Sequence, residues 1–296
     1  MELRILGSGT ASPSPERNCS GYLLSSIGKR FLLDAGPGTH AQLSRYGIPF
    51  NTINEIFITH FHLDHVNDLP AILFSLKNSF PKETLKFPTI HGPQGFGDNL
   101  NTLLAAYGTQ IVSEDMTLNI VEHSADEEDD IADFNIGLLN VKSLVMKHSE
   151  FSIGYRFNLY NESTAMPQPE SIDQEESIQS EGDLDEDEFI PDNIKRKVVP
   201  VKSFTYSGDT APCKNIIKLA DGTDCLLIEA TTTEENKLSG HSTIADSANV
   251  AMKAGVKTLI LTHISPENDR VNIVKKASEI FNGIVIVAKD GMRISI

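Results

Sequence analysis

Three histidines and one aspartate gather in the segment 59–65, which reads THFHLDH. They are His60, His62, Asp64 and His65. The cluster directly follows an apolar strand pattern and precedes a helical one, and solvated histidines have no reason to gather at a strand end. Imidazole and carboxylate groups are ligands that suit zinc, and they also suit iron and manganese. We therefore predict a metal site in this segment.

The spacing within the cluster suggests two groups of ligands. His60 and His62 alternate along an extended backbone, so their side chains point the same way. Asp64 and His65 lie past a turn and can face a second ion. No cysteine lies nearby, and histidine and carboxylate ligation leaves room for water, which argues against a closed structural zinc site.

The elements that must position this cluster alternate between short apolar strands and helical patterns. Strands are expected at 3–6, 21–26, 30–36, 55–60, 87–92, 138–148, 152–160, 202–210, 225–232, 258–265 and 283–291. Helices are expected at 40–47, 69–78, 96–108, 213–222, 243–255 and 271–281. Alternation of this kind predicts layers of α/β structure.

Composition and charge narrow the class of protein. The chain has 296 residues, of which 40 % are hydrophobic, so it can bury a sizeable core. Its formal net charge is -16, which disfavours non-specific binding to nucleic acid because phosphates are repelled. The three scattered cysteines predict free thiols in a reducing compartment. The start of the chain lacks a signal-peptide pattern, and no run approaches the ~18 apolar residues of a membrane span. We expect a soluble cytoplasmic protein that does not bind membranes.

The HxHxDH pattern after a strand resembles the signature of the metallo-β-lactamase superfamily. Further matches follow in order along the chain. Asp34, in LLDAG, resembles a residue that supports the site. His148, Asp209 and His263 occupy the places of the remaining ligands. The resemblance implies a single domain over 1–296, folded as a four-layer αββα sandwich with two mixed sheets flanked by helices.

The same resemblance implies two zinc ions, with manganese or iron as alternatives. The implied ligands of one ion are His60, His62 and His148, and those of the other are Asp64, His65 and His263. Asp209 would bridge the ions, together with a water or hydroxide. Two cations that bracket one water lower its pKa toward neutrality and stabilise the charge that develops at the reacting centre.

Three further segments resemble the ribonuclease Z group: the opening segment 7–24, IEAT at 228–231 and GHST at 240–243. In that group a carboxylate orients a loop histidine that contacts the scissile phosphate. The resemblance thus implies that Glu229 holds His241, and it makes Asp64, Glu229 and His241 the catalytic candidates. A carboxylate keeps an imidazole oriented and basic enough to be cationic. The plain alternative is that His241 is an exposed loop residue before a helix cap at Ser242 or Thr243.

Other parts depart from ribonuclease Z enzymes that cleave tRNA. The segment 161–192, where the tRNA-gripping arm would lie, is acidic and poor in apolar residues, so we expect a mobile surface arm that repels tRNA. Only 195–197 (KRK) is basic there, and a smaller acidic run at 125–130 is expected to be a turn. Pro15 replaces the lysine of the PxKxRN loop, and PEND at 266–269 replaces aromatic and basic residues.

These features leave four hypotheses in order. The first is a dinuclear zinc phosphodiesterase that acts on a small or non-tRNA phosphodiester by means of a metal-bridging hydroxide. The second is a tRNA 3′-processing endoribonuclease with a divergent arm. The third is a sulfatase or lactonase of the same fold, and the fourth is a non-catalytic metal-bound scaffold whose acidic arm recruits a basic partner. A homodimer is implied by resemblance alone. His40, His91 and His123 are expected to be ordinary residues.

Overall fold

Two mixed β-sheets form the centre of the computed structural model, which describes residues 1–12, 14–79, 86–111, 117–123, 131–149, 151–161 and 199–296. The first sheet contains, in spatial order, β14 (Arg293–Ser295), β1 (Glu2–Gly7), β2 (Gly21–Ser26), β3 (Lys29–Leu33), β4 (Glu55–Phe57), β5 (Thr89–Pro93) and β6 (Ile120–His123). The second contains β13 (Ile284–Val287), β12 (Thr258–Thr262), β11 (Cys225–Glu229), β10 (Lys202–Tyr206), β9 (Ile153–Leu159), β8 (Leu139–Val145) and β7 (Ala132–Ile136).

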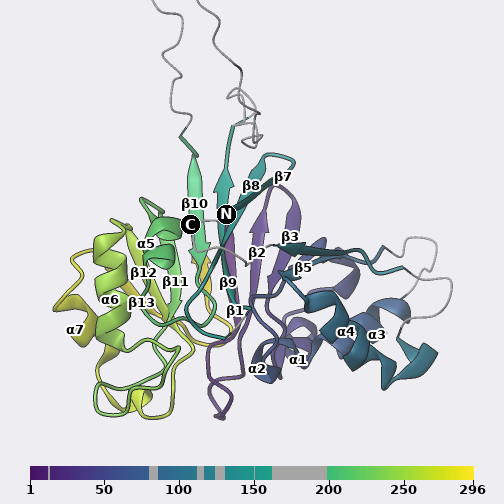
Figure 1. Ribbon diagram of the computed structural model, residues 1–296, viewed down its shortest axis with the longest axis horizontal. Helices are drawn as coiled ribbons and strands as arrows, with labels where there is room; N and C mark the ends of the chain where they lie inside the picture. The colour runs from purple at the N-terminus through teal and green to yellow at the C-terminus, as the bar shows by residue number, and fades with distance from the viewer. Residues whose placement is uncertain (13, 80–85, 112–116, 124–130, 150, 162–198) are drawn as a thin grey trace, which may run out of the picture.

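The two sheets share a pattern of strand directions. Strands β3, β4, β5 and β6 run parallel to one another. The pairs β14–β1, β1–β2 and β2–β3 are antiparallel. Likewise β10 to β13 are parallel, and β7 to β10 are antiparallel. Because β1 pairs with β14, the two ends of the chain lie side by side (Figure 1). Ligand sites of α/β proteins form at the carboxyl ends of parallel strands, so this topology points to the loops after β4, β10, β11 and β12.

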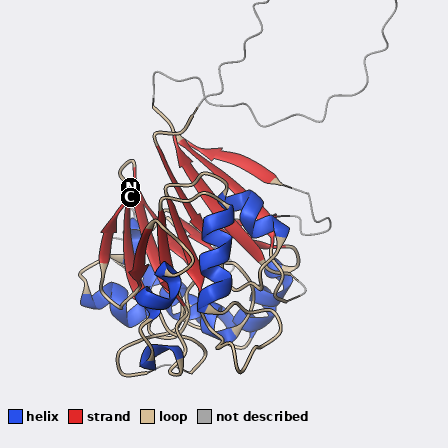
Figure 2. Cartoon of the chain, turned by 90° about the vertical axis from the view of Figure 1, so that its left-hand side faces the viewer, coloured by secondary structure: helices blue, strands red, loops and turns tan. Residues whose placement is uncertain are grey.

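Helices cover the outer face of each sheet (Figure 1). The first sheet carries α1 (Thr39–Arg45), α2 (Leu63–Val66), α3 (Leu69–Lys77) and α4 (Phe96–Ala105). The second carries α5 (Lys214–Ala220), α6 (Ile244–Lys253) and α7 (Ile273–Ser278), which lie in front of the strands in Figure 2. Short 3-10 helices are η1 (Phe50–Thr52), η3 (Gly108–Gln110) and η4 (Asn268–Arg270). The predicted αββα sandwich is confirmed.

Three apolar cores hold these layers together. The core between the sheets is rich in aromatic side chains, among them Tyr22, Phe31, Phe57, Tyr155, Phe157, Phe204 and Tyr206. Two outer cores join each sheet to its helices. Strands β11 and β12 are covered on both faces, which explains their uninterrupted apolar sequences. Each large side chain so buried stabilises the fold by about 1.5–3 kcal/mol, which gives the site loops a rigid base.

The structure differs from the expected elements in places that matter for the site. The expected strands at 55–60, 202–210 and 258–265 end early, at Phe57, Tyr206 and Thr262, because the residues beyond them form loops that carry ligands. Besides short 3-10 helices, the unexpected elements are α2, which is one turn long, and the edge strands β6, β7 and β14, whose side chains are mostly half-buried or exposed. The acidic run at 125–130 and nearly all of 161–192 lie outside the described residues, as does the basic triplet. Among the described helices, none has the length and apolar character to cross a membrane.

Candidate metal centre

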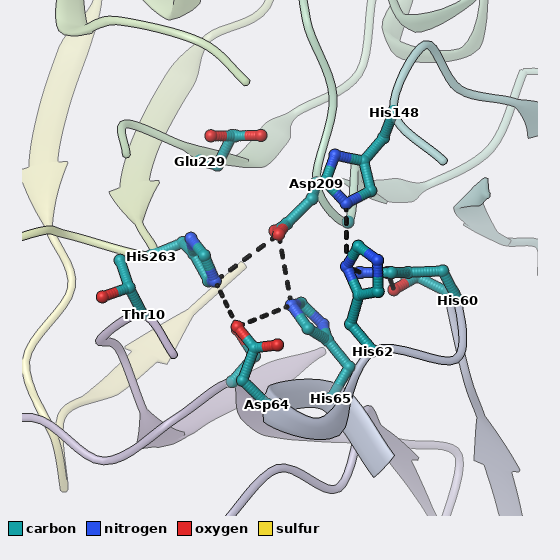
Figure 3. Close-up of polar contacts among 12 residues, drawn as sticks. Thr10, His60, His62, Asp64, His65, His148, Asp209, Glu229 and His263 are labelled. Carbon is teal, nitrogen blue, oxygen red and sulfur yellow. Dashed lines mark hydrogen bonds and ion pairs between the residues drawn. The ribbon is translucent and has the colours of Figure 1, made fainter. Parts of the chain in front are cut away.

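All seven predicted ligands meet at one edge of the sandwich (Figure 3). They come from the loop after β4 and the helix α2, and from the loops after β8, β10 and β12. They form two groups, and within each group the donor atoms lie within 4.8 Å of one another. The first group is His60, His62 and His148, and the second is Asp64, His65, Asp209 and His263. The structure thus brings together ligands that are up to about 200 residues apart in the sequence, as in the contact between Asp64 and His263.

The first group presents three ring nitrogens to one another. His60 Nε2 lies 3.0 Å from His62 Nδ1, and His148 Nε2 lies 3.1 Å from the same atom. The opposite nitrogens of two rings are engaged. His60 Nδ1 lies 3.0 Å from the Thr59 hydroxyl, and His148 Nδ1 lies 2.9 Å from the carbonyl of Gly240. Donation to these oxygens would leave the inner nitrogens as lone-pair donors.

Gly240 has a backbone conformation and a close approach to His148 that favour glycine. Its φ is +82°, and a Cβ there would lie 3.0 Å from His148 Nδ1. The glycine therefore lets its carbonyl approach the imidazole and fix its rotation. This explains in physical terms why the GHST segment begins with glycine.

The second group is built around Asp209, which lies between His65 and His263 in Figure 3. One Asp209 oxygen is 3.3 Å from His65 Nε2 and 3.5 Å from His263 Nε2. Asp64 reaches His263 Nε2 at 3.2 Å. His263 is oriented from behind by the Thr231 hydroxyl, 2.7 Å from its Nδ1. Asp209 also belongs to a possible ligand group with His148, so it lies within reach of both metal positions.

Asp34 supports the site from beneath, as the resemblance implies. Its side chain is fully buried, and it accepts hydrogen bonds from the Thr59 amide at 2.8 Å and from the Tyr206 hydroxyl at 2.6 Å. Its Oδ2 lies 2.8 Å from His65 Nδ1. Donation from His65 Nδ1 to this carboxylate would point Nε2 into the metal position and raise the ligand's basicity.

Two residues of the site hold a strained backbone. Asp34 has a φ of +55° and His263 a φ of +52°, which are left-handed values that L-residues seldom adopt. Strain of this kind persists only where the surroundings enforce it, and it gathers at functional sites. Here it turns each side chain inward at the end of its strand.

The electrostatics suit metal ligands. Burial lowers the pKa of His60 well below its ordinary value, with a further contribution from His65, and burial likewise lowers the pKa of His148. Neutral imidazole is the form that binds a metal. Burial opposes the charged form of Asp209, but His263 and His65 outweigh it and hold the pKa of Asp209 well below its usual range.

The donor set fits divalent cations. Converging imidazole lone pairs repel one another unless a cation lies between them, and ligands 2.0–2.1 Å from a zinc ion are about 3.3 Å apart in tetrahedral geometry. The observed 3.0 and 3.1 Å separations are close to that value. In addition, His65 Nε2 is fully buried and makes no hydrogen bond in the structure. A bound ion would satisfy it.

Glu229 and His241 lie beside this centre as a pair. Both Glu229 oxygens are 3.1 Å from His241 Nδ1, and one of them also accepts the Thr210 amide at 2.6 Å. Burial raises the pKa of Glu229, and the Asp209 charge adds to the rise. Burial alone would lower the pKa of His241, but the Glu229 hydrogen bond and charge reverse this and raise it. Thr243, not Ser242, caps α6, so the loop histidine stands just outside a well-anchored helix start.

A pocket of about 580 Å³ opens onto these groups, and we call it the polar pocket. Its walls include Asp64, Asp209, His241 and His263, together with hydroxyl and amide side chains from Thr10, Ser12, Thr231, Thr232, Thr233, Asn236 and Ser265. Within the described part of the chain, no lysine or arginine lines it.

Sequence reasoning missed four supporting residues: Thr59, Tyr206, Thr210 and Thr231. Thr59 and Thr210 directly adjoin His60 and Asp209, and Thr231 ends the IEAT segment, so these three could have been found from their positions in the motifs. Tyr206 carries no such signal. His40, His91 and His123 lie apart from the centre: His40 stacks on Phe50, and His91 stacks on His123.

Comparisons with known proteins agree with this geometry. A family model described as "Anti-Pycsar protein Apyc1" matches residues 1–176, and one described as "Beta-lactamase superfamily domain" matches residues 197–264. A protein named Ribonuclease Z from Methanothermobacter thermautotrophicus is 32 % identical, over 100 % of this chain and 97 % of that protein. One of the same name from Parabacteroides distasonis is 31 % identical, over 100 % of this chain and 99 % of that protein.

Solved structures are similar over the same length. The short form of human tRNase Z aligns with a TM-score of 0.68 and 25 % identity, covering 100 % of this chain and 99 % of that chain. The metallo-β-lactamase fold protein YhfI from Bacillus subtilis aligns with a TM-score of 0.70 and covers 99 % of this chain and 98 % of its own. Its 17 % identity supports the fold only.

Proposed function

The chain belongs to the ribonuclease Z family of metallo-β-lactamase-fold hydrolases, and from this premise we propose that it hydrolyses phosphodiester bonds of nucleotides at the centre formed by the seven ligands. The observation that carries the proposal is the junction of two ligand groups with an oriented His241–Glu229 pair. Two ligand groups fit a pair of cations, and the oriented imidazole fits a leaving group that needs a proton.

The residues divide the work as follows. His60, His62 and His148 would hold one zinc ion, Asp64, His65 and His263 the other, and Asp209 both. A pair of divalent ions at these positions supplies Lewis-acid charge, which activates water and neutralises charge on the phosphoryl oxygens. Manganese or iron would suit the same donors.

His241 lies where it can donate a proton to the leaving oxygen. Its Nδ1 is hydrogen-bonded to Glu229, which leaves Nε2 as the nitrogen that gains or loses a proton. The raised pKa of His241 favours the protonated form, which can donate to the leaving oxygen or stabilise charge on the phosphoryl group. Glu229 acts through His241 as a positioning residue, and Asp64 acts as a ligand beside the reacting atoms.

The polar pocket favours a small substrate. Its described lining has no lysine or arginine, so it offers a nucleic-acid strand no cationic contacts for the phosphates beyond the reacting one. Phosphate contacts dominate the affinity of proteins for nucleic acids, and the chain's net charge of -16 acts in the same direction. We propose a mono- or dinucleotide phosphodiester as the preferred substrate.

tRNA 3′-end cleavage is the second candidate. Its support is that relatives named Ribonuclease Z match this chain from end to end at about 30 % identity. We propose that the acidic segment 161–192 weakens tRNA binding here, because its charge repels phosphates.

Kinetics on matched substrates test this order. Zinc-supplied protein is given a dinucleoside monophosphate, a precursor tRNA with a 3′ trailer, an aryl sulfate and a lactone, and kcat/KM is compared. Cleavage of the dinucleotide with weak, salt-sensitive cleavage of tRNA is the expected result. A faster reaction with tRNA would favour the second candidate. A faster reaction with the sulfate or lactone would indicate a sulfatase or lactonase. Metal binding without turnover of any substrate would favour a scaffold.

Three further properties are proposed and tested separately. We propose one domain over 1–296 with the insertion 161–192 as a surface arm; proteolysis should cut the arm and leave two fragments that remain associated. We propose a homodimer, which light scattering would measure. We propose a cytoplasmic location from the cysteine content, and cell fractionation would check it.

A further inference from the structure

A second cavity of about 190 Å³ adjoins the metal centre, and we call it the aromatic pocket. It differs in character from the polar pocket. Three phenylalanines line it, Phe61, Phe96 and Phe151, together with the amide side chains of Gln94 and Asn99. The metal ligand His62 lines both pockets, so the two cavities meet at the first metal position.

The aromatic rings are held to different degrees. Phe96 is buried, with 1 % of its surface exposed, and its ring lies 5.6 Å from that of Phe61 in an edge-to-face arrangement of 64°. Phe61 is thereby fixed beside His62. Phe151 is 40 % exposed, so a large apolar face stays open to solvent next to a catalytic centre. Stacking of a planar ring would cover that face, and nucleobases stack on aromatic side chains with little dependence on sequence.

The two amides supply polar contacts at the rim. Gln94 follows β5, and Asn99 lies on α4; both are exposed. Within the described part of the chain, neither side-chain amide takes part in a hydrogen bond with another residue. Each carries donors and an acceptor, which matches the mixed donor and acceptor edge of a base. An aliphatic or lipid substituent would use the rings but not the amides.

Size and place restrict the occupant. Sites for drug-sized ligands enclose about 300–1,000 Å³, so a cavity of about 190 Å³ takes one ring system and not a whole nucleotide. Because His62 lines the cavity, its occupant lies next to the first metal position, as a base does when its sugar carries the phosphate that reacts. The described walls of neither pocket contain lysine or arginine, so stacking would replace phosphate contacts as the source of affinity.

We propose that the aromatic pocket is a subsite for one nucleobase flanking the scissile phosphate, while the hydroxyl-rich polar pocket takes the other substituent. The inference rests on the proposed phosphodiesterase function and adds the part of the substrate that is recognised. Phe151 and Phe61 stack on the base, and Gln94 and Asn99 contact its edge.

The kinetic test compares a dinucleoside monophosphate with two analogues, each of which has hydrogen in place of one base. Removal of the base on one flank should lower kcat/KM of the unaltered protein about 10- to 100-fold, and removal on the other flank should matter little. In Phe151→Ala, removal of that same base should no longer lower kcat/KM. Phe74→Ala is the matched control, since Phe74 is 46 % exposed on α3 and lines neither pocket. Equal rates on all three substrates for the unaltered protein would overturn the subsite but leave the phosphodiesterase intact.

A binding test decides the subsite independently of turnover. 2-Aminopurine riboside monophosphate loses fluorescence when its base stacks, and the chain has no tryptophan to interfere. Quenching is expected with the unaltered protein and with Phe74→Ala, and it should be lost in Phe151→Ala. If no dinucleotide is cleaved but quenching follows this pattern, the proposed function fails and the base subsite stands. If the unaltered protein causes no quenching, the subsite is wrong.

Discussion

Both carboxylate oxygens of Glu229 lie 3.1 Å from Nδ1 of His241. Glu229 is 1 % exposed at the end of β11, whereas His241 stands on the loop before α6 and lines the polar pocket. The buried carboxylate therefore fixes an imidazole that lines the polar pocket. His241 Nδ1 is also 3.9 Å from an Asp209 oxygen, which places the pair next to the ligands.

Replacement of His241 should remove proton transfer and leave the metal centre intact. His241→Ala is expected to lower kcat by about 10²–10⁴-fold on a substrate with a poor leaving group. The loss should shrink on an aryl ester, whose leaving oxygen needs no proton. Metal content, measured by mass spectrometry, should be unchanged; loss of metal from His241→Ala would instead mark His241 as a ligand.

Glu229→Gln separates positioning from catalysis. It should lower kcat by a smaller factor than His241→Ala and move the alkaline limb of the pH–rate profile to lower pH, because without its charged partner the imidazole loses its proton more readily. Added to His241→Ala, it should have almost no further effect, since residues that act as a unit are not additive. Additive losses in the double variant would show that Glu229 has a separate role.

Asp34 should control metal affinity without touching the metal. Asp34→Asn removes the negative charge and one of the two acceptor oxygens beside His65, and it should weaken metal binding about 10- to 100-fold, as found for partners that orient metal ligands. Competition with a chromophoric chelator measures this. Tyr206→Phe, which deletes one donor to Asp34, serves as a milder control and should have a smaller effect. Unchanged affinity in Asp34→Asn would contradict the assigned role.

The candidate ligands could be selected from the sequence because each sits in a short motif near the end of a strand. His60, His62, Asp64 and His65 lie within six residues, and the order of the remaining motifs pointed to the others. Tyr206 could not be found in this way, since its contact with Asp34 spans 172 residues and depends on how two sheets face each other. The same holds for the aromatic pocket, in which Phe61, Phe96 and Phe151 come from three separate segments.

The fold was predictable to a similar degree and for a similar reason. Strands buried on both faces, such as β11 and β12, have uninterrupted apolar sequences that identify them. Strand β7 reads ADFNI with mostly half-buried side chains, so its place comes from pairing with β8 and not from its own pattern. The one-turn helix α2 is too short to show a period of 3.6 residues.

The buried Arg17 should stabilise the loop near the start of the chain. Arg17 is 5 % exposed; it contacts Asp269 with two nitrogens at 2.7 and 2.8 Å and donates to Ser8 Oγ and the Ala288 carbonyl. The pair joins segments on either side of the polar pocket, whose walls include Ser12 and Glu267. Asp269→Asn should lower the free energy of unfolding by about 1–3 kcal/mol.

The same variant should raise KM more than it lowers kcat, because the pocket rim loosens while the ligands stay in place. Urea unfolding and steady-state kinetics measure the two effects. Glu279→Gln, on a residue for which the described structure shows no side-chain hydrogen bond or ion pair, is the control and should change neither. An unchanged KM in Asp269→Asn would refute a role for Arg17 in shaping the pocket.

His123 should make the fold sensitive to mild acid. It is 6 % exposed and stacks with Phe134, and its Nε2 lies 3.1 Å from His91 Nδ1, while His91 Nε2 faces Glu55 at 3.3 Å. Burial, with a contribution from His91, lowers the pKa of His123 to about 4. The unfolded chain binds the proton near pH 6.5, so between about pH 6.5 and 4 it holds more protons than the folded chain. Stability must then fall as the pH falls through this window, by up to about 3 kcal/mol, and the loss levels off below it.

Chemical unfolding at a series of pH values, compared between the unaltered protein and His123→Phe, measures this contribution. The phenylalanine ring can still stack on Phe134 but cannot take a proton. The difference in unfolding free energy between the two proteins should therefore change between about pH 6.5 and 4. Loss of the contact with His91 shifts the variant by a constant amount and does not alter that slope. Parallel curves for the two proteins, or an NMR titration of His123 with its midpoint near 6.5, would show that burial does not suppress its charge.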